Sequence, residues 1–342
     1  MKKKGTTHKQ PIPVFFAADE NYMPYLGVTL TSLKAHKNEE NRYEIYVLYT
    51  GALSENSAKI KRMAEENFSI TFVNITNKIE EITHLIRCRD YYTSAIYYRL
   101  FIPELFPQYD KAVYLDCDTV LLEDVAVLYA TELGANLIAA VSDQAVAAVV
   151  SFREYTQYAL GISYERYFNS GVILMNLEKM RALHFYEAFS KILSSYDFIV
   201  APDQDCLNLI CKDNVRYLDT GWNAMPMGGK LPQKRLKLVH YNLSLKPWHY
   251  DDVLYGEYFW GYAKESGFYE QIKATRAAFT KEQAQMDERS GERLIALAQA
   301  EADSPCNYVR TRVEKGQERA NEGGRYGFIE SFTRTPSGIK AD

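Results

Sequence analysis

Two aspartates, Asp116 and Asp118, directly follow a short apolar run over residues 112–115. In an extended segment, side chains alternate between two faces, so these carboxylates point to the same side and Cys117 points to the other. Two carboxylates on one side repel each other unless a cation lies between them. Oxygen ligands of this kind suit Mg²⁺ or Mn²⁺, and such ions usually complete their shell with phosphate oxygens. The pair therefore predicts a divalent metal at a phosphate-binding site.

The same acid pair is open to other interpretations. A D-x-D sequence after a strand also occurs in ordinary loops, where the carboxylates only solvate their own turn. The residues DCDTV at 116–120 also match haloacid-dehalogenase-type phosphatases, in which Asp116 would be the nucleophile and Asp118 the general acid. Those enzymes carry the motif on their first strand, whereas more than a hundred residues precede it here. A third interpretation is a nucleotide-sugar glycosyltransferase, whose acid pair holds the metal on the donor's diphosphate.

Other acids follow predicted strands in the same way. The strand predicted over residues 12–18 ends at Asp19, and the strand predicted over residues 137–141 ends just before Asp143. In open α/β sheets, ligands bind along the edge where the strands have their carboxyl ends. We therefore expect Asp19, Asp116, Asp118 and Asp143 to lie along one edge.

Further candidates lie outside the strands. Asp203 and Gln204 open a helix predicted over residues 206–212, where acids also serve as ordinary capping groups. Arg99 lies in an apolar setting, so it either reaches the surface or faces a buried acid or phosphate. A lone His at a strand end is more often structural than a ligand. His240, with Lys246 six residues later and an acid pair upstream, favours a binding role.

The elements around these residues alternate between strands and helices. Strands are predicted over residues 12–18, 44–49 and 70–75, and helices over residues 25–37 and 55–67 lie between them. Short polar loops connect the elements. This order predicts an α/β fold with a Rossmann-like, mostly parallel central sheet flanked by helices. Later elements are predicted as a helix over residues 93–101 and a strand over residues 172–176.

The sequence changes character near residue 280. Residues 281–302 predict a charged helix interrupted at Ser290-Gly291, followed by a polar tail. We therefore expect a basic N-terminal arm over residues 1–11, a catalytic domain over residues 12–279 and a helical or flexible C-terminal extension over residues 280–342.

Composition excludes several classes of protein. The net charge of −4 argues against nucleic-acid binding, which depends on clustered Lys and Arg. Five cysteines without C-x-x-C spacing predict neither a disulfide framework nor a zinc site. No apolar stretch is long enough to span a membrane or to form a signal-peptide core. We expect a cytoplasmic protein with at most peripheral contact at the inner face of the membrane.

Six motifs, in order between residues 12 and 262, resemble those of glycosyltransferase family 8, the group that contains glycogenin and bacterial lipopolysaccharide galactosyl- and glucosyltransferases. They are FAADENY, IYYRLFIPEL, VYLDCDTVLLEDV, YFNSGVILMNL, PDQDCLN and HYNLSLKPWH. The resemblance implies a GT-A fold, a donor that is usually a UDP-sugar, a divalent metal and retention of the anomeric configuration. One position departs from the pattern: bacterial members often carry Gly between the His and the Lys, where this chain has Leu243.

The resemblance also implies roles for individual residues. The implied metal ligands are Asp116, Asp118 and His240, and the implied diphosphate-binding residue is Lys246. The implied residues beside the reacting carbon are Gln204 and Asp203. The implied donor-binding residues are Ala17, Asp19, Asn21, Tyr22, Arg99, Asp116, Cys117, Asp118, Asp143, Asn169 and Ser170.

The first hypothesis is a retaining hexosyltransferase that uses Mn²⁺ or Mg²⁺ to transfer galactose or glucose from a UDP-sugar to a glycan or lipid-linked saccharide. Charge develops on the leaving diphosphate, where a metal and a lysine stabilise the transition state. The metal-dependent phosphatase and a protein that binds a nucleotide sugar without turnover remain the alternatives. The sequence leaves the hexose, the acceptor and the oligomeric state open, and it favours same-face attack over a covalent intermediate on Asp203.

Overall fold

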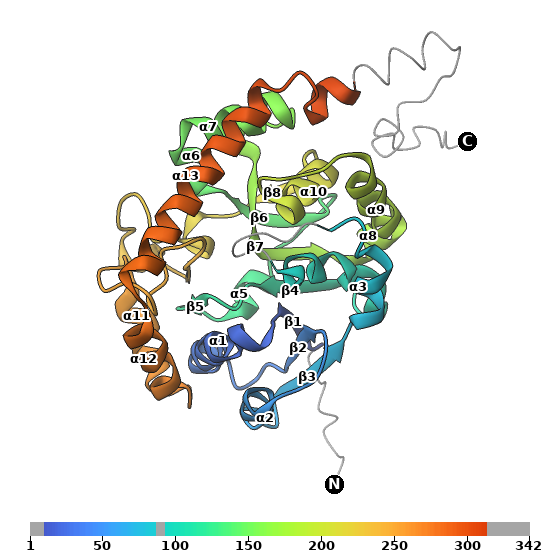
Figure 1. The fold of residues 1–342 in the computed structure, drawn as a ribbon. Helices are drawn as coiled ribbons and strands as arrows, with labels where there is room; N and C mark the ends of the chain where they lie inside the picture. The colour runs from blue at the N-terminus through green and yellow to red at the C-terminus, as the bar shows by residue number, and fades with distance from the viewer. Residues whose placement is uncertain (1–9, 87–92, 313–342) are drawn as a thin grey trace, which may run out of the picture.

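The computed structural model describes residues 10–86 and 93–312, which form a layered arrangement of helices around a central sheet (Figure 1). Nearly all of the basic arm expected over residues 1–11, and the part of the C-terminal extension after residue 312, lie outside the described residues. Among the described helices, none is both long enough and apolar enough to cross a membrane.

A seven-stranded sheet forms the centre of the fold. Its strands are β1 (Ile12–Ala17), β2 (Tyr43–Tyr49), β3 (Phe68–Asn74), β4 (Lys111–Leu115), β6 (Ile138–Ser142), β7 (Phe168–Asn176) and β8 (Val215–Tyr217). They lie in the order β3-β2-β1-β4-β7-β6-β8. All neighbouring pairs are parallel except the two that β7 makes with β4 and β6. The prediction of a mostly parallel, Rossmann-like sheet is confirmed.

Each face of the sheet carries its own hydrophobic core. Because side chains alternate along β1, Val14 and Phe16 enter one core and Phe15 enters the other. The first core is covered by α1 (Met23–His36), α2 (Glu55–Lys61), α5 (Val125–Tyr129), α11 (Gly256–Ala263) and α12 (Tyr269–Ala278). The second is covered by α3 (Thr76–Ile82), α4 (Ile102–Leu105), α6 (Gln144–Ala148), α7 (Val150–Glu154), α8 (Leu177–Ala182), α9 (Phe185–Ser195) and α10 (Pro202–Cys211).

Smaller elements complete the fold near the carboxyl edge of the sheet. A two-stranded sheet pairs β5 (Thr119–Leu121) with β9 (Leu238–His240) in antiparallel orientation. The 3₁₀ helices are η1 (Glu20–Tyr22), η2 (Ser94–Phe101), η4 (Tyr164–Arg166), η5 (Thr220–Asn223) and η6 (Gln233–Arg235), and η3 (Tyr155–Ala159) is a π-helix.

Several elements predicted from the sequence have other boundaries in the structure. The helix expected over residues 206–212 is α10, which begins four residues earlier, at Pro202. The helix expected over residues 55–67 ends at Lys61, because a turn follows and Glu65 pairs with Phe68. The helix expected over residues 93–101 is the 3₁₀ helix η2, and α4 begins after it with Pro103 in its first turn, where a missing N–H costs nothing. The strand expected over residues 172–176 begins earlier, at Phe168.

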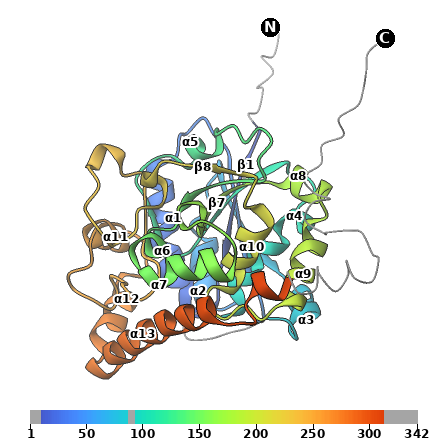
Figure 2. The same cartoon turned by 90° about the horizontal axis from the view of Figure 1, so that it is seen from above.

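The predicted interruption of the C-terminal helix is also wrong. Helix α13 runs without a break over Lys281–Asp303 and crosses the molecule from α12 to α7 (Figures 1 and 2). Glycine in a helix costs about 1 kcal/mol relative to alanine. A capping box offsets this cost, since the N–H of Gln283 donates to Thr280 at 3.2 Å and the N–H of Thr280 donates to Gln283 at 2.8 Å. Packing of α13 on α7 and η3 adds tertiary stabilisation.

Candidate functional site

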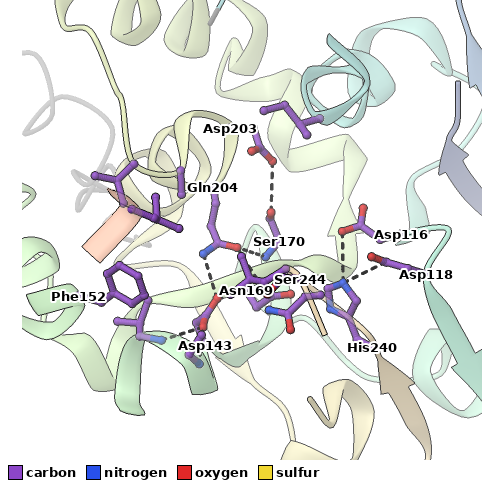
Figure 3. A pocket seen from close by; sticks show the side chains of 18 of the residues that line it. Asp116, Asp118, Asp143, Phe152, Asn169, Ser170, Asp203, Gln204, His240 and Ser244 are labelled. Atoms are coloured by element: carbon purple, nitrogen blue, oxygen red, sulfur yellow. Dashed lines mark hydrogen bonds and ion pairs between the residues drawn. The ribbon is translucent and has the colours of Figure 1, made fainter. Parts of the chain in front are cut away.

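A cavity of about 550 Å³ lies at the edge where β1, β4 and β6 have their carboxyl ends (Figure 3). Ala17 ends β1, Asp116 follows β4 and Asp143 follows β6, and all three line the cavity. Because β7 runs in the opposite direction, its first residues, including Asn169 and Ser170, reach the same edge. The sequence-based expectation that Asp19, Asp116, Asp118 and Asp143 lie along one edge is confirmed, because all four line this cavity.

Asp116, Asp118 and His240 form a cluster that fits a divalent metal ion. The register of β5 and β9 places Thr119 opposite His240 and so brings the imidazole to the acid pair. One ligand atom from each residue lies within 4.8 Å of the others. Asp118 Oδ1 is buried and accepts no hydrogen bond from the described residues, although His240 Nε2 lies 3.2 Å away. A Cβ at Gly171 would lie 2.3 Å from the imidazole, so only glycine leaves room for this arrangement.

Lys246 forms a buried ion pair with Asp118 and also donates to the carbonyl of Tyr241. Burial alone would raise the pKa of Asp118, but the charge of Lys246 and the neighbouring His240 hold this pKa below its usual range. Asp118 is therefore a carboxylate at neutral pH. The lysine supplies positive charge where a metal-bound diphosphate would need it.

Arg99 links the metal cluster to Asp203. Its guanidinium is buried, lies 3.0 Å from Asp116 Oδ1 and 3.4 Å from Asp203 Oδ2, and stacks over the ring of Tyr114 at 4.4 Å. Of the two alternatives for Arg99, the structure shows that it faces buried acids. Burial raises the pKa of Asp203 to about 6, although Arg99 acts in the opposite direction.

Gln204 is held rigidly beside these acids. Its Oε1 accepts from the N–H of Ser170 at 2.9 Å and from Asn169 Nδ2 at 3.2 Å, while its Nε2 donates to Asp143 at 3.0 Å (Figure 3). A backbone donor on one side and a carboxylate on the other define which end of the amide is oxygen. The amide is thereby oriented toward the cavity that it lines.

Asn223 is a site residue that the sequence analysis missed. Its Oδ1 lies 3.0 Å from His240 Nδ1, and its Nδ2 donates to Asn169 Oδ1 at 2.9 Å. Because Asn223 presents oxygen to the imidazole, Nδ1 carries the proton and Nε2 offers its lone pair to a metal. Asn223 lies in η5, seventeen residues before His240, and no motif marks it. Contacts of this kind orient metal ligands without touching the metal.

Replacing Asn223 with alanine is expected to weaken Mn²⁺ binding by about 10–100-fold, because the imidazole loses its orientation. Asn223→Asp keeps an oxygen opposite His240 and should retain most of the affinity. Calorimetric titration of each variant with Mn²⁺ measures the effect, and thermal unfolding of the metal-free proteins serves as the control. Equal affinity in the alanine variant and the unaltered protein would contradict the role of Asn223.

Asp205 is a buried residue next to the site that does not line the cavity. It is fully buried and accepts hydrogen bonds from the hydroxyls of Tyr155 at 2.8 Å and Tyr167 at 2.6 Å, and from the N–H of Ala201 at 3.1 Å. Burial raises the pKa of Asp205 to about 7, while the tyrosine hydrogen bonds oppose the shift. Asp205 thus ties the start of α10 to two tyrosines.

We expect Asp205 to make stability depend on pH. An unfolded Asp releases its proton near pH 4, whereas the folded group keeps it until about pH 7, so the folded state holds one more proton between these values. Stability therefore falls as pH rises through this window. The free energy of unfolding should drop by roughly 2–3 kcal/mol more between pH 5 and pH 8 in the unaltered protein than in Asp205→Asn. Urea unfolding of both proteins tests this, and parallel pH profiles would contradict it.

Leu243 occupies a left-handed backbone conformation, with φ of 54°. Glycine adopts this conformation without cost, whereas a leucine there stores about 1–2 kcal/mol of strain. The one departure from the family pattern therefore falls at a position whose geometry favours glycine. Leu243 lines the cavity, so its side chain occupies space that a glycine would leave empty.

Most residues predicted from the sequence to bind the donor or the metal meet in this cavity. Those that line it are Ala17, Asp19, Tyr22, Arg99, Asp116, Cys117, Asp118, Asp143, Asn169, Ser170, Asp203, Gln204, His240 and Lys246. Asn21 is exposed and is not among the residues that line the cavity. Its N–H instead donates to Asp19 at 2.9 Å, so Asp19 caps the turn as well as lining the site.

Comparison with known proteins shows the family and several relatives. The model of glycosyl transferase family 8 matches residues 13–252. General stress protein A from Bacillus subtilis is 28% identical over 213 residues, which cover 60% of this chain and 71% of that protein. Lipopolysaccharide 1,2-glucosyltransferase from Escherichia coli K12 is 29% identical over 255 residues, which cover 69% of this chain and 72% of that enzyme.

Solved structures show the same fold. The galactosyltransferase LgtC, in complex with donor and acceptor sugar analogs, superposes with a TM-score of 0.65 and 28% identity over 74% of this chain and 96% of its own. The apo structure of the bifunctional glycosyltransferase WbbM has a TM-score of 0.67 with 24% identity, covers 80% of this chain and 53% of its own, and supports the fold alone. The predicted GT-A fold is confirmed. These matches lend no support to the phosphatase alternative.

Proposed function

The chain belongs to glycosyltransferase family 8, and from this premise we propose that it transfers galactose or glucose from a UDP-sugar to a glycan or lipid-linked saccharide, with retention of the α configuration and with Mn²⁺ or Mg²⁺. The observation that carries the proposal is one cavity that joins the Asp116, Asp118 and His240 cluster to the hydrogen-bonded Gln204. We place the reaction in the cytoplasm, with at most peripheral contact to a membrane, and with no nucleic-acid partner.

Each group of residues has a distinct task in the proposed reaction. A bound divalent ion supplies Lewis-acid stabilisation of the leaving diphosphate. Asp116, Asp118 and His240 would hold that ion, and Lys246 adds positive charge beside Asp118. Asp143, Asn169 and Asp203 present polar groups for the hydroxyls of the transferred sugar. The remaining donor-binding residues proposed are Ala17, Asp19, Asn21, Tyr22, Arg99, Cys117 and Ser170.

Gln204 and Asp203 are the candidates beside the reacting carbon. An amide is a poor nucleophile, but its oxygen stabilises a centre that becomes oxocarbenium-like. Asp203 is already engaged, since it accepts from Ser170 Oγ at 3.2 Å and pairs with Arg99 at 3.4 Å. We therefore propose same-face attack, in which the leaving phosphate accepts the proton of the acceptor hydroxyl, with Gln204 beside the anomeric carbon and Asp203 positioning the sugar.

Incubation with UDP-galactose or UDP-glucose, Mn²⁺ and a panel of saccharide acceptors tests the proposal. We expect UDP release that depends on the metal and an α-linked product by NMR. A β-linked product would refute retention, and a glycosyl ester trapped on Asp203 would refute same-face attack. Phosphate release from simple phosphomonoesters without any transfer of sugar would favour the phosphatase instead.

A further inference from the structure

Helix α13 presents one face to the active-site cavity. The residues of α13 that line the cavity are Asp287, Ser290, Gly291, Leu294 and Ile295. Their spacing of three and four residues places them on a single helical face. Both parts of the helix are anchored: Asp287 accepts from the hydroxyl of Tyr250 at 2.8 Å, and Ala298 and Ala302 are buried. The helix therefore forms a wall of the cavity and not a separate appendage.

The wall that α13 forms with α6 and α7 is mainly apolar. Its apolar side chains that line the cavity are Val146, Val149, Phe152, Leu294 and Ile295. We name this group the apolar wall. α13 contacts α7, and Phe152 lies on the side of Gln204 and Asp143 away from Asp116, Asp118 and His240 (Figure 3). The apolar wall thus lies beyond the sugar-binding groups as seen from the metal cluster.

The position and chemistry of this wall indicate what occupies it. If the metal cluster holds the donor's diphosphate, as in the proposed function on which this inference rests, the far side of Gln204 receives the acceptor. Sugar hydroxyls need hydrogen-bond partners, and burying them against aliphatic side chains is unfavourable. An apolar group gains free energy from the same burial. α13 also lies outside residues 13–252, the part of the chain that matches the family.

We propose that the apolar wall is an acceptor subsite that binds an apolar aglycone, an alkyl or aromatic group attached to the saccharide that receives the hexose. Ile295 is 39% exposed and lines the cavity, so it is available to such a group. Gly291 lines the cavity next to it, and a Cβ at Gly291 would meet nothing within 4 Å. The missing side chain at Gly291 keeps the subsite open.

Binding of glycosides with different aglycones tests the subsite directly. In the presence of UDP and Mn²⁺, we expect octyl galactoside or octyl glucoside, kept below the micelle-forming concentration, to bind about tenfold or more tightly than the methyl glycosides. Phenyl glycosides form a second arm that distinguishes an aromatic from an alkyl aglycone. The absence of any preference over methyl glycosides in both arms would overturn the proposal.

Three variants test whether the preference for octyl over methyl glycosides depends on α13. Ile295→Gln should reduce the octyl-to-methyl preference by about threefold or more, because it places a polar group in the wall. Met286→Gln is the matched control, since Met286 is 65% exposed on the same helix and is not among the residues that line the cavity. Gly291→Leu should abolish octyl-glycoside binding by filling the subsite, while replacing helical glycine does not destabilise the helix.

The same samples separate this inference from the proposed function. UDP affinity depends on the metal cluster, and we expect UDP to bind the three variants as tightly as the unaltered protein. Loss of UDP binding in the unaltered protein would refute the proposed function. Normal UDP binding combined with equal effects of Ile295→Gln and Met286→Gln, or with unaltered octyl binding in Gly291→Leu, would refute the acceptor subsite alone.

Discussion

Replacing Asp118 with asparagine is expected to lower turnover by about a thousandfold, because the metal cluster loses a buried carboxylate that has an unsatisfied oxygen. Asparagine has nearly the same shape, so the fold should persist. Stability should nevertheless fall, since Lys246 loses its buried partner and an unpaired buried charge is costly. UDP and Mn²⁺ together should no longer raise the melting temperature of this variant.

Initial rates with the donor and Mn²⁺ measure the loss of turnover. Thermal unfolding with and without UDP and Mn²⁺ measures how much the two ligands raise the melting temperature. Asp110→Asn is a matched control, because the side chain of Asp110 is 83% exposed and neither Asp110 nor its partner Arg181 lines the cavity. A double variant, Asp118→Asn with Lys246→Met, should recover part of the lost stability. Undiminished Mn²⁺-dependent activity in Asp118→Asn would refute the metal assignment.

Replacing Lys246 with methionine is expected to lower kcat by about 100–1000-fold, because the leaving diphosphate loses the positive charge of this lysine. The same substitution is expected to strengthen metal binding, although it weakens catalysis. In the unliganded protein Lys246 neutralises Asp118, so its removal leaves two carboxylates and an imidazole that attract the ion more strongly. Mn²⁺ measured without UDP should therefore bind about tenfold more tightly.

A lower kcat together with tighter Mn²⁺ binding distinguishes a lysine that acts on the donor from one that only stabilises the fold. If Lys246 only held the fold together, its loss would weaken metal binding and catalysis together. Lys234→Met is the control, because Lys234 is exposed in η6 and does not line the cavity. Calorimetry with Mn²⁺ and steady-state kinetics on the same preparations decide the question. Weaker Mn²⁺ binding in Lys246→Met would contradict the proposed role.

Much of the fold followed from local sequence patterns. Apolar runs that predict strands, in turn with segments of helical spacing, predicted β1, β2 and the mostly parallel sheet. The period of apolar residues within an element is a local property, so the sequence records it. The boundaries that failed depend on tertiary contacts. β7 begins early because Phe168 pairs with Ser142 of β6, and α13 continues through Gly291 because it packs on α7 and η3.

The sequence by itself determined the chemical character of this protein: two carboxylates after a buried strand, and an imidazole and a lysine that match a family pattern. Only the tertiary structure decided which groups touch. Asn223 contacts His240, Arg99 bridges Asp116 and Asp203, and α13 lines the cavity. Such contacts join segments that are far apart in the chain. The packing of whole elements sets them, so no local pattern of residue types records them.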